Sequence, residues 1–86
     1  MERIEFLRKG FVNTIFTNTR IIQNKLDEFC GDTENTIEEF PNDNHFVVTM
    51  VKKPYLKPQG TQKYMFTIYN NPNGFAHIAD VIELFD

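Results

Sequence analysis

The stretch HFVVTMVKK, residues 45–53, decides the class of fold, because its side chains alternate in the way that a strand requires. Successive residues of an extended chain point to opposite faces, so Phe46, Val48 and Met50 share one face. The stretch KYMFTIY, residues 63–69, alternates in the same way. Both stretches are rich in β-branched and aromatic residues, which are typical of strands. We therefore predict an antiparallel hairpin of 45–53 and 63–69.

The residues before this hairpin predict one long helix over 2–30. At about 100° per residue, their apolar side chains form a stripe that keeps its phase throughout. Gly31 follows the stripe and suits the C-terminal end of a helix. Thr17, Asn18 and Thr19 are poor helix formers, so a kink at this point stays open.

Two weaker signals complete the predicted fold. Residues 36–40 read as an edge strand, ended by Pro41, within the acidic connector 32–44. Residues 75–85 predict a C-terminal helix, because their apolar side chains recur at helical spacing. The predicted fold is α+β, with a small antiparallel sheet of two or three strands and both helices on one face of the sheet. We expect residues 1–86 to form a single domain.

Composition and charge argue against several classes of protein. The net charge of −3 argues against a dedicated nucleic-acid-binding protein, which usually carries a positive excess. Cys30 is the one cysteine, so it can form no internal disulfide and gives no sign of an oxidising compartment. The first residues lack the apolar core of a signal peptide, and no apolar run approaches the length of a membrane span. We expect a cytoplasmic protein that does not bind membranes.

The candidate catalytic and metal-binding residues are few. Cys30 could act as a nucleophile with His45 or His77, but a cysteine among apolar neighbours usually behaves as a small hydrophobic residue. Asp43 with His45, and His77 with Asp80, form pairs that offer too few ligands for a metal site. The glycines are scattered and form no phosphate-binding loop. We therefore expect no enzymatic activity, no metal and no cofactor.

Charge is segregated along the chain. Residues 26–51 hold seven acidic residues and no Lys or Arg, and the acidic residues that we expect to contact a partner are Asp32, Glu34, Glu38, Glu39 and Asp43. The loop that follows, KKPYLKPQGTQK at 52–63, is basic, and its candidate contacts are Lys52, Lys53, Tyr55, Leu56, Lys57 and Lys63. One interpretation is that both segments are merely solvated, since exposed charge pairs contribute little. The other is that the acidic segment binds a basic protein surface.

The leading hypothesis is a small non-enzymatic protein-binding module, an inhibitor or modulator of the kind found in phages and mobile elements. It would occlude the functional surface of a host protein, such as an enzyme that acts on nucleic acids. Phe6 and Phe16 fall outside the apolar stripe, so they are either covered by other elements or exposed as anchors for the partner. The alternative is a nucleic-acid-binding protein that uses the lysines of the basic loop, with Tyr55 or Tyr64 as a stacking platform. A homodimer through the long helix is a third option.

Overall fold

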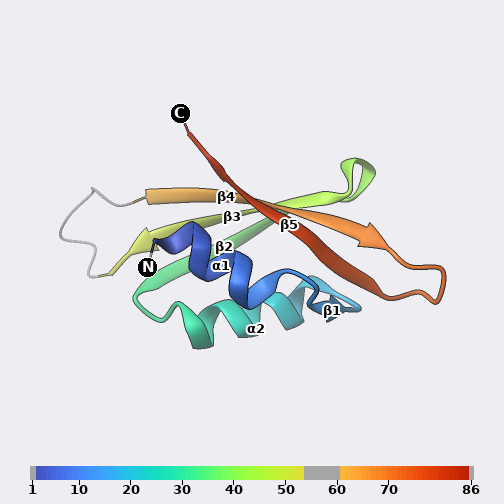
Figure 1. The fold of residues 1–86 in the computed structure, drawn as a ribbon. Coiled ribbons are helices and arrows are strands. Elements are labelled where there is room, and N and C mark those ends of the chain that lie inside the picture. Colours follow the sequence, from blue (N-terminus) through green and yellow to red (C-terminus); the bar gives the residue numbers. More distant parts are fainter. Residues whose placement is uncertain (1, 54–60, 86) are drawn as a thin grey trace.

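The structure, a computed structural model, describes residues 2–53 and 61–85. In chain order its elements are α1 (Arg3–Phe11), β1 (Ile15–Phe16), α2 (Thr19–Phe29), β2 (Thr33–Phe40), the 3₁₀ helix η1 (Pro41–Asp43), β3 (His45–Lys52), β4 (Thr61–Asn70) and β5 (Ala76–Leu84). The strands form one antiparallel sheet in the order β1-β5-β4-β3-β2. Both helices lie on one face of this twisted sheet, which we call the inner face, and we call the opposite face the outer face (Figure 1).

The predicted hairpin is present as β3 and β4, which pair with Phe46 opposite Phe66 and Val48 opposite Tyr64. The Phe46 and Phe66 rings stack with their centroids 4.9 Å apart, and Phe11 meets Phe66 edge-on at 5.5 Å. These rings lie in the core between sheet and helices, which consists of Leu7, Phe11, Phe16, Ile22, Leu26, Cys30, Phe46, Val48, Met50, Tyr64, Phe66, Ile78 and Val81. The alternation of the two strands therefore predicted the inner-face residues of the hairpin correctly.

The predicted long N-terminal helix is wrong, because the chain forms two shorter helices with β1 between them. Asn13 has a φ of 71°, a left-handed conformation that interrupts a helix and that Asn adopts more readily than most residues. Ile15 and Phe16 then pair with β5. Asn18 begins α2, since its side-chain oxygen accepts a hydrogen bond from the N–H of Arg20 at 3.0 Å. The single long helix on which the homodimer hypothesis relied is therefore two helices.

The predicted C-terminal helix over 75–85 is also wrong, because these residues contain the strand β5. β5 pairs with β4, and a register shift leaves Ala79 without a cross-strand partner. An extra residue of this kind is a β-bulge, and it reverses the faces to which the following side chains point. The bulge places the buried Ile78 and Val81 three residues apart, which is also the spacing of one helix face. The strand therefore imitates the apolar pattern of a helix.

β2 extends the predicted strand 36–40 back to Thr33, and the sheet has five strands rather than two or three. The predicted architecture was wrong in both the number of strands and the identity of the helices. β2 lies at one edge of the sheet and pairs with β3, from Thr33 opposite Lys52 to Phe40 opposite His45. On the inner face, α2 packs against β2 and α1 packs against β5.

Candidate protein-binding surface

In the described part of the chain both helices cover the inner face, so the outer face of the sheet is open (Figure 1). The cross-strand register aligns Glu38, Val47, Met65 and Ile82 in one row across β2, β3, β4 and β5, which we call the outer row. Ile82 is 38% exposed, as is Leu84 two residues further on, whereas Val47 and Met65 are half-buried. Apolar side chains thus cross an open sheet face and end at a carboxylate on β2.

The acidic residues of β2 and η1 differ in their position relative to this face. The odd-numbered residues of β2 face the core, so Glu34 and Glu38 lie on the outer face. Strand geometry separates these two residues by about 13 Å. Glu39 is exposed near the end of β2, beside a cavity of about 210 Å³, and Asp43 lies in η1 beyond the sheet. Of the five predicted acidic contacts, Glu34 and Glu38 therefore belong to the outer face, whereas Glu39, opposite Phe46, lies on the inner side at the end of the sheet.

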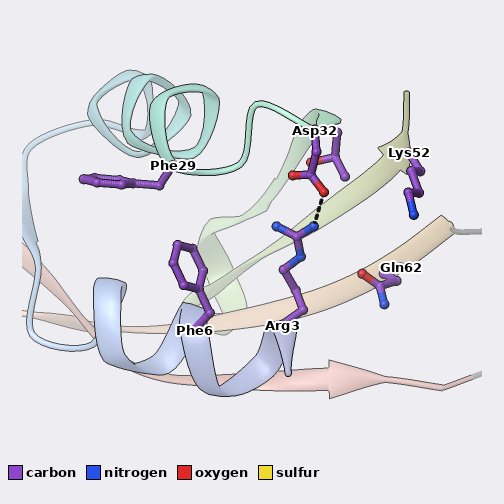
Figure 2. A pocket seen from close by; sticks show the side chains of 7 residues that line it. Arg3, Phe6, Phe29, Asp32, Lys52 and Gln62 are labelled. Carbon is purple, nitrogen blue, oxygen red and sulfur yellow. Dashed lines mark hydrogen bonds and ion pairs between the residues drawn. The ribbon is translucent and has the colours of Figure 1, made fainter. Parts of the chain in front are cut away.

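The fifth acidic residue, Asp32, is engaged within the chain. Its Oδ2 accepts a hydrogen bond from Nη2 of Arg3 at 2.6 Å (Figure 2). This hydrogen bond lowers the pKa of Asp32 below its ordinary value and raises the pKa of Arg3. The ion pair connects α1 to the start of β2, so the charge of Asp32 is already balanced.

The Arg3–Asp32 pair lies in a cavity of about 530 Å³ that is lined by both helices and the adjacent end of the sheet (Figure 2). Phe6 of α1 and Phe29 of α2 form its apolar side, and Phe29 is 53% exposed. Lys52 lines the same cavity from the end of β3. The cavity combines apolar side chains with charges of both signs, and among the described residues that line it Asp32 is paired with Arg3 while Lys52 is a second cation.

The two phenylalanines that sequence reasoning proposed as anchors have different positions. Phe6 is half-buried, packs against the core and lines this cavity. Phe16 is 5% exposed and meets Phe46 edge-on, with 6.2 Å between ring centroids. The strand β1 turns Phe16 into the core, so it offers no exposed surface to a partner.

Two titratable side chains are buried in the core, Tyr64 of β4 and Cys30 at the end of α2. Tyr64 is fully buried, and its hydroxyl has no hydrogen-bond partner among the described residues. Burial, with a smaller contribution from the Glu83 carboxylate, raises the pKa of Tyr64 to about 12. Cys30 is also fully buried, and burial raises the pKa of its thiol. Because the thiolate is the reactive form, Cys30 is poorly suited to act as a nucleophile.

The structure separates Cys30 from the histidines. Cys30 accepts a hydrogen bond from Oγ1 of Thr33, the first residue of β2, which pairs with the last residue of β3. His45 begins β3 and so lies about 23 Å away along that strand. His77 lies on β5 beside the ring of Tyr69. Within residues 2–53 and 61–85, no group of three or more His, Cys, Asp or Glu side chains could hold a metal ion.

The predicted basic contacts divide between two sides of the molecule. Lys52 lines the Arg3 cavity, whereas Lys63 lies opposite Thr49 on the outer face. The backbone N–H of Lys53 donates to the carbonyl oxygen of Asp32 at 2.9 Å, which continues the β2–β3 ladder. The other candidate contacts, Tyr55, Leu56 and Lys57, lie outside the described residues.

Sequence reasoning missed the β5 contribution to the outer row. Asp80, Ile82 and Leu84 alternate with Val81 and Glu83, which is a strand pattern over the last part of the chain. That pattern places Ile82 and Leu84 on one face of a strand. It was missed because the bulge at Ala79 interrupts the alternation just before it. The Arg3–Asp32 pair left no local signal, because 29 residues separate its members.

Comparison with known proteins gives no family for this chain. It matches no protein-family model, no curated protein and no solved structure. Within the described residues, neither helix combines the length and the apolar composition needed to cross a membrane.

Proposed function

We propose that this chain is a small non-enzymatic protein-binding module that docks the outer face of its sheet onto a basic protein surface. One observation carries the proposal: the open outer face joins apolar side chains of three strands to an acidic margin on β2. Ile82 and Leu84 are each 38% exposed there. An exposed apolar patch that is bordered by polar residues is typical of protein-binding surfaces.

The two parts of this surface would have different roles in docking. Burial of Met65, Ile82 and Leu84 would supply most of the affinity, because apolar area removed from water is the main favourable term in association. Glu38 and the neighbouring carboxylates would accelerate the encounter and select a basic partner. The molecule has extents of 45 × 26 × 22 Å, so its broad side exceeds the roughly 800 Å² that each partner buries in an interface of standard size.

Docking of this kind suits an inhibitor or modulator that covers the functional surface of a host protein, of the type encoded by phages and mobile elements. A partner that itself binds nucleic acid would present the required basic surface. We place this action in the cytoplasm, since the single cysteine, Cys30, is a free buried thiol and the fold requires no oxidising compartment.

The test compares one surface variant with one control. The double variant Glu38→Lys with Ile82→Asp changes the outer row, whereas Glu28→Lys makes the same charge reversal at an exposed position of α2. Proteins captured from host lysate by wild type would be purified, and their Kd for wild type, Glu28→Lys and the double variant measured by calorimetry. We expect a loss of affinity of at least about tenfold in the double variant alone. A purified partner that binds all three chains equally would refute the proposal.

Among the described residues the nucleic-acid alternative has no matching observation, because Lys52 and Lys63 lie on different sides of the sheet. A mobility-shift assay at low salt with single- and double-stranded DNA and RNA tests it directly. Binding that weakens steeply with salt would favour this alternative over protein docking.

A further inference from the structure

The two edges of the sheet differ in how their backbone groups are satisfied. β2 forms one edge, and its hydrogen bonds to β3 use alternate residues. The hydrogen bond from the N–H of Lys53 to the carbonyl of Asp32 fixes the phase of this ladder. The even-numbered residues of β2 therefore bond to β3, and the N–H and C=O groups of its odd-numbered residues point away from the sheet.

Along β2, the outward groups are satisfied near its start and open near its end. The N–H of Thr33 donates to the carbonyl of Cys30 at 3.2 Å, and the carbonyl of Asn35 accepts from Nε2 of Gln23 at 2.9 Å. Further along, Ile37 and Glu39 each direct one N–H and one C=O outward. Among the residues that the structure describes, these four groups have no hydrogen-bond partner in the chain.

The opposite edge is covered by the chain itself over residues 76–81, and of the outward groups of β5 only those of Glu83 have no partner among the described residues. β1 pairs with Ala76 and His77, and Ile78 exchanges hydrogen bonds with the loop after α1. Val81 is enclosed by two side chains: Nε of Arg8 donates to its carbonyl at 2.9 Å, and its N–H donates to Oδ1 of Asp80 at 2.8 Å. The bulge at Ala79 further distorts this edge. Bulges and covering segments are devices that prevent strand addition, and they are concentrated on the β5 side.

We propose that the β2 edge around Ile37 and Glu39 binds an extended, basic segment of the partner by strand addition. The inference rests on the proposed function and names its mode of docking. Strand addition would pair the four outward groups with the main chain of the segment, while alternate side chains select its sequence. β2 is an eight-residue strand in unbroken register with β3, so its edge is regular enough to template another strand.

The charge of β2 selects the occupant. Its sequence, TENTIEEF, contains three glutamates and no Lys or Arg. A second copy of β2 would bring carboxylates against carboxylates, which is unfavourable for cross-strand neighbours. In a segment with lysine or arginine at alternate positions, the cations share one face of the strand, so on the outer face they would lie beside Glu38. The edge therefore favours a basic strand from another protein over self-association.

A peptide of defined chemistry tests this directly. The probe is a short blocked peptide of alternating lysine and valine, and its control is the same peptide with every backbone amide N-methylated, so that neither edge can pair. Amide hydrogen exchange of the intact protein is followed by NMR. We expect the lysine–valine peptide to slow exchange at Ile37 and Glu39 about tenfold, and the N-methylated peptide to give no protection. Equal effects of both peptides, or no protection at either amide, would overturn the inference.

A matched pair of variants separates backbone pairing from charge. Glu39→Pro removes the outward N–H of an exposed residue and leaves the ladder to β3 intact, since proline is tolerated at such edge positions. Glu39→Gln removes the charge and keeps the N–H. We expect Glu39→Pro to weaken peptide binding about tenfold more than Glu39→Gln. Equal weakening in the two variants would show that charge alone accounts for binding.

The same variants distinguish failure of this inference from failure of the proposed function. If a partner is lost by the outer-row double variant but binds Glu39→Pro as tightly as wild type, the outer face docks the partner without strand addition. If the partner is lost by Glu39→Pro and keeps full affinity for the outer-row variant, strand addition stands and docking through the outer face is refuted.

Discussion

Tyr64→Phe removes a hydroxyl group that is buried without a hydrogen-bond partner among the described residues. Tyr64 is fully buried on the inner face, so the ring of the variant would keep its packing and lose only the polar atom. A buried polar group without a partner costs about 1–3 kcal/mol of stability. Removal of the hydroxyl also leaves a small void, which offsets part of the gain. We expect the variant to be about 1 kcal/mol more stable at neutral pH.

The stability difference should also change with pH. The pKa of Tyr64 is about 12 in the folded protein and 10.0 without the environment of the fold. Because the pKa of Tyr64 is higher in the folded protein, folding favours the protonated phenol. The free energy of unfolding of the wild type therefore keeps its full value below pH 10 and falls as pH rises towards 12. A difference of 2 pKa units corresponds to about 3 kcal/mol. The advantage of Tyr64→Phe should therefore grow over this interval.

The assay is urea unfolding followed by circular dichroism at pH 7 and at several values between pH 10 and 12. Tyr69→Phe is the matched control, since Tyr69 is 57% exposed and its hydroxyl is not buried. A stabilisation of about 1 kcal/mol would raise the melting temperature by roughly 4–8 °C in a domain of this size. If Tyr64→Phe is destabilised at pH 7 while Tyr69→Phe is unchanged, the Tyr64 hydroxyl has a favourable partner and the reasoning fails.

Three further predictions follow from single contacts. Asp32→Asn should lower the free energy of unfolding by no more than about 1 kcal/mol at pH 7, because the pair with Arg3 is partly exposed. In urea unfolding at lower pH this penalty should fade as Asp32 is protonated below its lowered pKa. An undiminished penalty would refute the ion-pair explanation. Cys30 should react with a thiol reagent only at the rate of unfolding or local opening, and fast labelling of the native chain would contradict its burial. Asn44→Ala should lower the free energy of unfolding by about 1–2 kcal/mol, because Asn44 has a φ of 53° and accepts a hydrogen bond from Asn70. Asn44→Gly should lower it less, because glycine adopts this conformation freely. Thermal melting measures both variants.

The hairpin of β3 and β4 was predictable because two signals agree there. Side chains such as Val48 and Phe66 alternate strictly with less buried neighbours, and β-branched and aromatic residues dominate both strands. With one face buried, a slip of one residue would expose the whole apolar set, so the pattern specifies the register strongly. Local sequence was sufficient wherever the period of the strand was uninterrupted.

The errors arose where a local interruption changed the period. The bulge at Ala79 gave β5 the apolar spacing of a helix, and the turn at Asn13 lay inside a stripe that α1 and α2 happen to continue in phase. The poor helix formers at 17–19 were visible in the sequence. Whether they mark a kink or the start of a second helix is decided by the pairing of β1 with β5, a strand more than 50 residues away. Tertiary contacts, rather than propensities, decided these segments.

The candidate surface was predictable in part. Glu34 and Glu38 stood out through charge segregation, and the edge strand at 36–40 lies within β2. The contribution of Ile82 was not foreseen, because it required β5 to be a strand. Nor could the sequence distinguish Asp32, which pairs with Arg3, from the exposed acidic residues beside it.

The pairing of β1 with β5 also governs when the protein can fold. α1 packs on β5, and its Arg8 reaches the carbonyl of Val81 across 73 residues of sequence. On the ribosome, the first helix therefore emerges long before the strand that stabilises it. Contacts between such distant segments slow folding, because a large loop must close before they form. The nascent chain should remain incompletely packed until its last strand is synthesised, which makes β5 the element that completes the domain.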